Sequence, residues 1–174
     1  MRLSIALALV GGCSGGLEPP PQEVTETPVP AVRADASTGA IVLTHGGQGS
    51  PASRSDGPAA AAEAAWAALA SGAERREAAI EAIAILEDDP RFNAGKGANL
   101  RLDGATIQCD AAIMDVDDEG QPRFGAVSGL SGVRSPVRVA RAVMDTPHLL
   151  LAGEGARAFA ERRGAELSPL ETPQ

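Results

Sequence analysis

Glycine and proline divide the hydrophobic residues of this chain into short runs, so its fold must be built from short strands and helices. The apolar run at residues 40–44 (AIVLT) stops at His45-Gly46-Gly47-Gln48-Gly49. This pattern predicts a buried strand that ends in a glycine-rich turn. Further along, residues 100–102 and 105–114 flank Asp103-Gly104, which predicts a β-hairpin, and another strand is expected at 124–130.

Helical spacing is predicted in the stretches between these strands. Asp56-Gly57-Pro58 opens an alanine-rich helix through residue 70, and residues 74–87 carry an apolar stripe that ends before Pro90. Ser135 is expected to cap a helix that begins at Pro136, and a last helix is expected over 154–163. The order of strand, two helices, strands and helices favours an α/β (α+β) fold, in which helices cover a mixed sheet.

Composition and charge limit the function classes. With 174 residues, of which 44% are hydrophobic and 22% charged, the chain has the size and composition of one globular domain. Aromatic residues make up only 2% of the chain and its net charge is −8, which excludes base-stacking platforms and disfavours contact with phosphate backbones. We therefore expect no nucleic-acid partner.

Residues 1–13 resemble the signal peptide of a bacterial lipoprotein. Met1-Arg2 supplies a positive charge, residues 3–10 (LSIALALV) are apolar but too few to span a bilayer, and small residues precede Cys13. We expect cleavage before Cys13 and lipidation of its thiol, and the alternative is a short buried helix with an ordinary cysteine. The expected location is the periplasm or the outer membrane of a bacterium, with membrane contact only through the lipid anchor.

Residues 14–38 are rich in proline, glycine, glutamate and threonine, and this composition cannot bury a core. The predicted organisation is therefore a signal peptide at 1–13, a disordered tether at 14–38 and a folded region at 39–174. Within the folded region Cys109 has no partner for a disulfide, and we expect it to be a buried strand residue.

Common catalytic and metal-binding motifs are incomplete in this sequence. The Gly-x-Ser-x-Gly pattern at 129–133 lacks its last glycine, and a nucleotide-binding loop is excluded by Gly97, which follows Lys where Ser or Thr is required. His45 and His148 lack a third ligand in metal-binding spacing and so predict no zinc site. The glycine turn at 45–49 is the first candidate site, since backbone N–H groups in such a turn can bind an anion.

Seven sequence blocks follow one another in a distinctive order. They are His45-Gly46-Gly47, 86–97 (LEDDPRFNAGKG), 110–115 (DAAIMD), 125–127 (GAV), 135–144 (SPVRVARAVM), 146–151 (TPHLLL) and 153–160 (GEGARAFA). In this order the blocks resemble the plant-type L-asparaginase and isoaspartyl peptidase family, and the resemblance covers about residues 40–164. The Phe92-Asn93-Ala94-Gly95 stretch is similar to the asparaginase-like members rather than to the related glycosylasparaginases.

The resemblance implies an N-terminal-nucleophile hydrolase with a four-layer αββα sandwich, of which this chain is the α-chain half. Members of the family are made as precursors that cut themselves, and the cut frees a threonine at the start of the β chain. The hydroxyl of that threonine is the nucleophile and its own α-amine is the base. The implied substrates are L-asparagine or β-aspartyl dipeptides, the implied partner is the β chain, and an (αβ)2 dimer is expected.

The resemblance also implies roles for individual residues. Asn93 matches an asparagine that lines the active site, and His45, Gly46 and Gly47 match a loop close to the nucleophile. For Asn93 and the glycines the alternative is simple turn chemistry. The family binds a structural Na+ through backbone carbonyls, which by resemblance are those of Leu86, Glu87, Asp89, Phe92, Ala94 and Lys96. Carbonyl oxygens suit a hard alkali cation, and no other cofactor is implied.

No threonine of this sequence stands in the Gly-Thr-Val-Gly context that the family uses at its cleavage point. We therefore expect the nucleophile to lie beyond residue 174 and this chain to be inactive alone. Two hypotheses follow: the α part of an asparaginase or isoaspartyl peptidase, or a truncated, noncatalytic surface lipoprotein that retains the α-chain fold. Half a sandwich would expose a sheet face, which is an aggregation hazard in an isolated chain.

Overall fold

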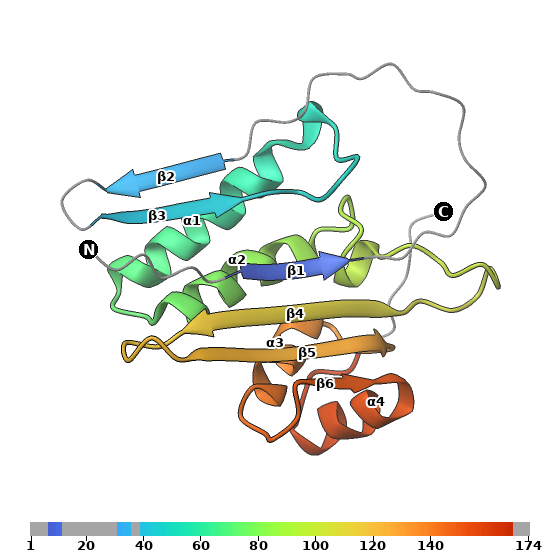
Figure 1. Ribbon diagram of the computed structural model, residues 1–174. Coiled ribbons are helices and arrows are strands. Elements are labelled where there is room, and N and C mark those ends of the chain that lie inside the picture. The colour runs from blue at the N-terminus through green and yellow to red at the C-terminus, as the bar shows by residue number, and fades with distance from the viewer. Residues whose placement is uncertain (1–6, 12–30, 36–38, 169–174) are drawn as a thin grey trace.

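The computed structural model describes residues 7–11, 31–35 and 39–168 of the chain (Figure 1). Its strands are β1 (Leu7–Gly11), β2 (Ala31–Asp35), β3 (Ala40–Thr44), β4 (Cys109–Val116), β5 (Pro122–Leu130) and β6 (Leu150–Ala152). Its α-helices are α1 (Asp56–Ala70), α2 (Arg75–Asp88), α3 (Pro136–Val143) and α4 (Gly153–Arg162), and short 3-10 helices occupy Ala52–Arg54 and Gly95–Gly97. From β3 onward the helices and the strands β4 and β5 follow the predicted order, whereas the strand predicted at 100–102 does not form.

The strands form two sheets. One has the order β1-β4-β5-β6, in which only β5 and β6 are parallel, and the other is the antiparallel pair β2-β3. The connection from β5 to the parallel strand β6 passes through α3. The predicted mixed α/β class is therefore confirmed.

Local sequence explains where the first two helices end. After α1 the chain turns at Gly72, whose φ of 90° is in the left-handed region that glycine adopts readily. Helix α2 stops at Asp88, two positions before Pro90, because proline disfavours helical backbone in the residue that precedes it. Both ends agree with the sequence prediction.

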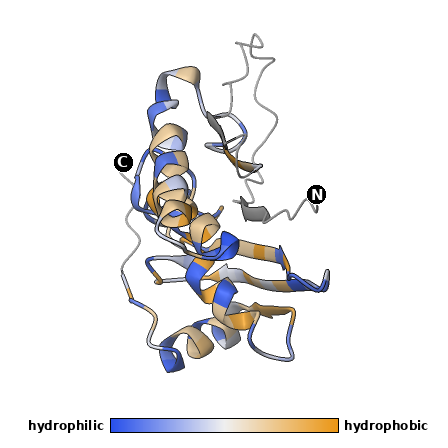
Figure 2. Ribbon diagram, turned by 90° about the vertical axis from the view of Figure 1, so that its left-hand side faces the viewer, coloured by the Kyte–Doolittle hydropathy of each residue, from blue (hydrophilic) through white to orange (hydrophobic). Residues whose placement is uncertain are grey.

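Two clusters of buried side chains hold the helices against the strands. The first joins α3 and α4 to β4 and β5 and includes Ile113, Val127, Leu130, Val137 and Phe159. The second joins α1 and α2 to β3 and includes Val42, Ala61, Ala65, Leu86 and Phe92. Much of the second cluster is alanine, which lets α1 and α2 approach closely, and Figure 2 shows these helices on one side of the strands.

The opposite face of β3 is apolar and uncovered. Val42 points toward the helices and is buried, whereas Ile41 and Leu43 on either side of it are 66% and 63% exposed. On β5, Phe124 is also exposed. A layer of strands covered by helices on one side is the arrangement expected of one half of an αββα sandwich.

Two of the described strands lie outside the region predicted to fold. Strand β2 falls within residues 14–38, the expected tether, and pairs with β3 from Ala31↔Thr44 to Asp35↔Ala40, so ordered pairing begins before residue 39. Strand β1 falls within the expected signal peptide and pairs with β4, so the alternative of a short buried helix is wrong for residues 7–11. Cys13 and the proline-rich residues 14–30 lie outside the described residues. No helix in the described part of the chain is long and apolar enough to cross a membrane.

The hairpin predicted around Asp103-Gly104 is reduced to one isolated bridge, Leu100↔Ile107. The Asp103 carboxylate accepts hydrogen bonds from the backbone N–H groups of Ala105 and Thr106, which holds the turn but prevents a longer ladder. Regular pairing starts at Cys109, which is buried as predicted, and burial raises the pKa of its thiol to about 11.

Candidate functional site

The glycine turn after β3 is closed by its own histidine. The backbone N–H of Gly47 donates to Nδ1 of His45 over 3.0 Å, and the N–H of Ser50 donates to the carbonyl of Gly47 over 3.2 Å. Gly47 and Gly49 have φ values of 91° and 81°, which explains why glycine stands at both positions. The His45 side chain is exposed, so the turn presents polar groups at the surface.

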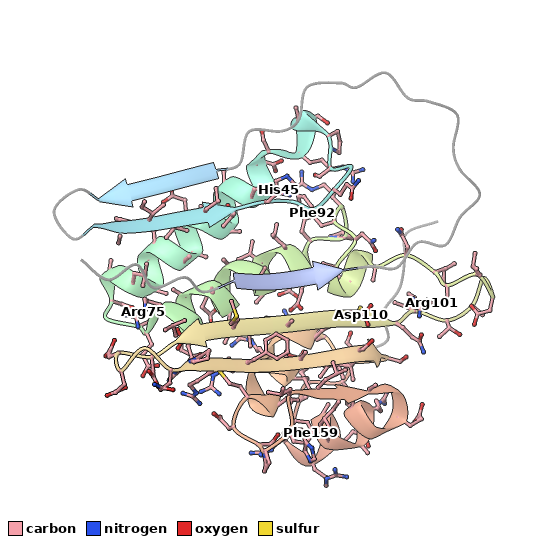
Figure 3. All side chains as sticks on the ribbon, in the orientation of Figure 1. His45, Arg75, Phe92, Arg101, Asp110 and Phe159 are labelled. Atoms are coloured by element: carbon pink, nitrogen blue, oxygen red, sulfur yellow. The ribbon has the colours of Figure 1, made fainter. Side chains whose placement is uncertain are left out.

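Phe92 joins this turn to the loop after α2. Its ring is buried and lies against Gly46 at the turn and Gly57 in the first turn of α1 (Figure 3). A Cβ placed on Gly46 would lie 2.7 Å from the Cε1 atom of the ring, and a Cβ on Gly57 would clash with Cε2. Both glycines are therefore required by the close approach of one aromatic side chain.

A charged clamp fixes the same loop from outside. The guanidinium of Arg91 binds both carboxylate oxygens of Asp56 at 3.0 and 2.8 Å and also binds Asp89. Arg54 donates to the carbonyl of Arg91. The Arg91 guanidinium lowers the pKa of both Asp56 and Asp89. The clamp thus ties the start of α1 to the residues that precede Phe92.

Asn93 follows Phe92 directly and its side chain is exposed. Its Oδ1 accepts a hydrogen bond from the backbone N–H of Asn99 over 2.9 Å, which leaves the side-chain NH2 as a possible donor to a ligand. Through Phe92 the structure therefore brings the loop that carries Asn93 against the His45–Gly47 turn. These are the two segments that the sequence singled out.

Glu87 supports the loop from inside the protein. Its side chain is 1% exposed and accepts hydrogen bonds from the hydroxyl of Ser135 at 2.6 Å and the backbone N–H of Val137 at 2.9 Å. Burial raises the pKa of this carboxyl to about 7. Ser135 stands at the N-cap position of α3 as predicted, but its side chain makes no capping hydrogen bond, because Glu87 from α2 takes the backbone N–H that it would bind.

Comparison with known proteins adds the deciding observation. The sequence model of the Asparaginase_2 family, described as asparaginase, matches residues 31–173. The chain belongs to this asparaginase family. An isoaspartyl peptidase/L-asparaginase from Mus musculus is 40% identical over 152 residues, which are 83% of this chain and 45% of that protein. A relative of the same description from Danio rerio is 38% identical over 138 residues, 76% of this chain and 43% of its own length.

A plant-type L-asparaginase from Pyrococcus abyssi is 42% identical over 131 residues, which cover 71% of this chain and 41% of the relative. The chain therefore spans less than half the length of the curated relatives that it matches. The matched region begins at residue 31, where β2 begins.

Of the six carbonyl oxygens expected to bind Na+, three accept backbone hydrogen bonds within the loop: that of Asp89 from Phe92, that of Phe92 from Ala94 and that of Ala94 from Gly97. A Cβ on Gly95 would lie 2.6 Å from the carbonyl oxygen of Glu87, and a Cβ on Gly97 would clash with that of Phe92. Both glycines are therefore required by the close approach of backbone carbonyl groups, and the Na+ ligand set stays a prediction. Among the described residues, no group of three or more His, Cys, Asp or Glu side chains could hold a metal ion.

The described threonines are all engaged in local structure. The hydroxyl of Thr44 donates to the carbonyl of Pro58 at 2.6 Å, that of Thr146 donates to Val143 at 2.7 Å, and that of Thr106 donates to Asp103. Thr44 is nearest to the glycine turn in sequence, and its hydrogen bond fixes the end of β3 to α1. None of these three hydroxyls lies at a chain start, where its own amine would be the base.

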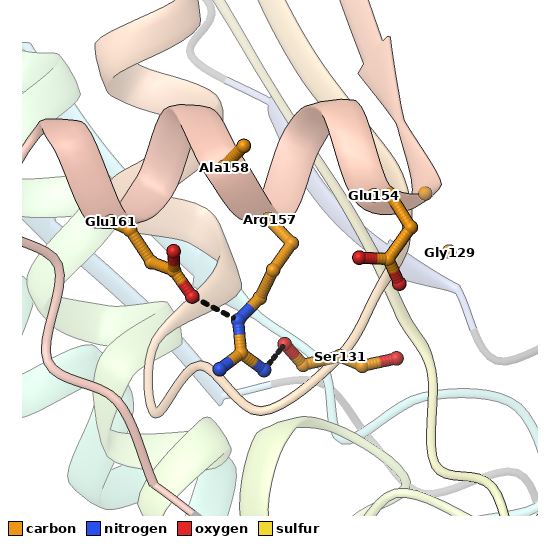
Figure 4. Close-up of a pocket in the computed structure, with 7 residues that line it drawn as sticks. Gly129, Ser131, Glu154, Arg157, Ala158 and Glu161 are labelled. Carbon is orange, nitrogen blue, oxygen red and sulfur yellow. Dashed lines mark hydrogen bonds and ion pairs between the residues drawn. The ribbon is translucent and has the colours of Figure 1, made fainter.

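Two pockets lie away from the glycine turn. One, of about 240 Å³, is lined by residues of α4 and the end of β5, and Arg157 in it binds the carbonyl of Ser131 and the carboxylate of Glu161 (Figure 4). The other, of about 460 Å³, lies between α2, α3 and the end of α4. Neither is lined by His45, Phe92 or Asn93.

Sequence reasoning missed the residues that position the site. Asp56, Arg91 and Gly57 were treated only as helix-start and loop residues, and Glu87 was assigned a role only through its carbonyl. Arg91 and Asp56 are 35 positions apart, so no local pattern signals their pairing. The glycine in the first helical turn was the available signal, since glycine has low helix propensity and its presence there called for a packing reason.

Proposed function

We propose that this chain is the α part of an asparaginase or isoaspartyl peptidase, which hydrolyses L-asparagine or β-aspartyl dipeptides once a threonine-bearing β part is present. Family membership supports the general chemistry, and the names of the relatives supply both substrate classes. The observation that carries the proposal is the contact of Phe92 with Gly46, because it brings together the two segments of the site that belong to this chain.

In the proposed complex the threonine hydroxyl attacks the side-chain carbonyl of the substrate, and the α-amine of the same threonine accepts the proton. Ammonia, or the amine of a dipeptide, leaves, and water then releases aspartate from the acyl-threonine. The His45–Gly47 turn forms the wall beside the nucleophile. The NH2 group of Asn93 donates a hydrogen bond into the site.

The carbonyl oxygens of Leu86, Glu87, Asp89, Phe92, Ala94 and Lys96 would hold Na+ in the same complex. A bound cation there would hold the loop in one conformation. The role of this chain's residues is to keep Asn93 in place through that loop, and the Arg91 clamp and the Glu87 hydrogen bonds act in the same direction.

The exposed side chains of Ile41 and Leu43 favour this function over a noncatalytic lipoprotein that works alone. Two large aliphatic side chains on an uncovered strand need a covering layer, and a β part of the family would supply it. An (αβ)2 assembly is the proposed final state.

We further propose that the chain is exported and anchored through Cys13. The support is in the sequence: a positive start, an apolar run at 3–10 and small residues before the cysteine. In that state the enzyme would act in the periplasm or at the outer membrane of a bacterium.

The function is tested by complementation. The full chain is mixed with the part of the Pyrococcus abyssi relative that this chain does not match, prepared to begin at its nucleophilic threonine, and ammonia release from L-asparagine and from a β-aspartyl dipeptide is measured. We expect release only when both parts are present, and at least about 100-fold less with Asn93→Ala. Formation of a stable complex without ammonia from either substrate would overturn the proposal.

A further inference from the structure

One edge of strand β4 is paired with β1, a strand from near the start of the chain. On one side β4 pairs with β5, and on the other it pairs with β1 over five consecutive positions, from Leu7↔Met114 to Gly11↔Asp110. No other strand among the described residues pairs with that side of β4. Without β1, the outward backbone groups of residues 110–114 would therefore be unpaired.

The place that β1 occupies lies between the two sheets. Figure 1 shows β1 between β4 and the β2-β3 hairpin, and neither β2 nor β3 pairs with the larger sheet. Helices α1 and α2 pack together, with α1 against β3 and α2 close to β4 and β1. The two helices thus pack against each other, and of the described strands β1 alone lies between β4 and the β2-β3 hairpin.

The sequence of β1 lacks two features that protect natural edge strands. Residues 7–11 (LALVG) contain no charge and no proline, either of which helps to prevent an edge from taking up another strand. In the edge that it covers, residues 111–114 (AAIM) carry no charge, and the carboxylate of the remaining residue, Asp110, accepts hydrogen bonds from Ser128 and Gly129 of β5. Such an edge recognises an extended apolar segment through main-chain hydrogen bonds.

We propose that the outer edge of β4 is a strand-acceptor site, and that residues 7–11 occupy it in the unprocessed chain in place of a strand of the complementary part. The second clause rests on the proposed function, because it requires a β part. The sequence also assigns these residues to a leader. Cleavage of the leader before Cys13 would remove residues 7–11 from β4. The outer edge of β4 would then be free to pair with a strand of the β part.

The occupancy of the edge is tested by hydrogen exchange, followed by mass spectrometry, on the full chain purified without processing. The test variant carries both Ala8→Pro and Leu9→Pro. Successive residues of a strand point their N–H groups to opposite sides, so one of the two prolines removes a donor to β4 whatever the register. The control variant carries Ser14→Pro and Gly15→Pro, which lie outside the paired positions.

We expect the amides of residues 110–114 that face β1 to exchange at least about tenfold faster in the test variant than in the wild type or the control. Amides of β5 that face β4 should not change. Equal exchange of residues 110–114 in all three proteins would overturn the strand-acceptor site.

The competition is tested separately by measuring the affinity of the same proteins for the threonine-bearing part of the Pyrococcus abyssi relative. We expect the double-proline variant to bind at least about tenfold more tightly than the wild type, because no strand has to be displaced. Equal affinities would overturn the claim that β1 stands in for a partner strand. Absence of binding to every variant would contradict that claim together with the proposed function, and the exchange result would still decide whether the edge accepts a strand.

Discussion

At the scale of single residues, the site depends on one aromatic ring and two glycines. Phe92 fills the space that side chains at Gly46 and Gly57 would occupy, and it is buried together with the helix residues around it. Aromatic residues make up only 2% of the chain, and Trp66 packs against the same buried cluster. Asn93 therefore takes its position from a packing contact made by the residue before it.

A methyl group at Gly57 tests this packing. Glycine to alanine within an exposed helix stabilises a protein by up to about 1 kcal/mol. For Gly57→Ala we expect the opposite sign, a loss of about 1–3 kcal/mol in the free energy of unfolding, because the new Cβ would clash with the ring of Phe92. Urea unfolding of the variant measures this value.

Gly155→Ala is the matched control, since Gly155 lies in α4 and a Cβ there would meet nothing within 4 Å. It should be neutral or stabilising. Combining Gly57→Ala with Phe92→Leu should cost less than the sum of the two single changes. Additive losses would show that the ring does not set the requirement for glycine.

At the scale of secondary-structure elements, the hydrophobic pattern predicts most of what forms. The bounds of α1 and α2 follow from glycine, proline and apolar spacing, and the buried strand at 40–44 follows from its run of aliphatic residues. Strands β1 and β2 were not predicted. Strand β1 pairs with β4, which is distant in sequence, and β2 lies in the segment that was expected to be a disordered tether. Local composition around residues 14–38 indicates only low hydrophobicity.

In the candidate site, too, some features follow from local sequence and others from contacts between residues that are far apart in the chain. The glycine turn and the loop with Asn93 could be chosen from the sequence, and in the structure Phe92 brings the two segments into contact. The cap of α3 was assigned to Ser135 because serine is the usual local solution. The capping group comes instead from Glu87, 50 positions before Val137, and no sequence spacing reports such a contact.

The Glu87 cap makes the link between α2 and α3 sensitive to pH. The carboxyl has an ordinary pKa of 4.5 and a pKa of about 7 when folded, because burial disfavours its charge. Between these values the folded chain holds a proton that the unfolded chain has released. The stability from this group is therefore complete below about pH 4.5 and is lost as the pH rises to about 7.

Glu87→Gln removes this titration and keeps an oxygen that can accept a hydrogen bond. We expect the free energy of unfolding of the wild type to fall, relative to the variant, by roughly 3 kcal/mol from about pH 4.5 to about pH 8, at 1.36 kcal/mol per pKa unit. Urea unfolding across this range measures the difference. Parallel pH profiles for the two proteins would contradict the assignment of the titration to Glu87.

At the scale of the whole molecule, the chain has a helical layer, a strand layer and an uncovered strand face. The larger buried cluster lies between the helices and β4-β5, whereas Ile41 and Leu43 on β3 remain mostly exposed. The chain also covers less than half the length of the relatives that it matches. Both observations support the proposal that this chain is one part of a larger fold.

Replacing the exposed aliphatic residues tests the role of this face. We expect Ile41→Thr with Leu43→Thr to reduce self-association of the isolated chain, because threonine retains β propensity while removing apolar surface. Sedimentation velocity at several concentrations measures the association. Leu102→Thr is the control: Leu102 is 88% exposed but lies in the loop before β4, so it should have no effect.

The same double variant should bind the complementary part at least about tenfold more weakly than the wild type does. Unchanged binding would show that the face of β3 is not the surface covered in the complex. Equal self-association of the double variant and the wild type would show that this face does not drive association of the isolated chain.

If the proposed function is right, the threonine nucleophile lies outside residues 1–174, and the DNA sequence that follows the codon for Gln174 tests this most directly. We expect a Gly-Thr-Val-Gly segment within a few tens of codons, in frame or in a neighbouring frame. A stop codon followed by no such segment in any frame would contradict it and would leave an asparaginase-like fold without an enzyme.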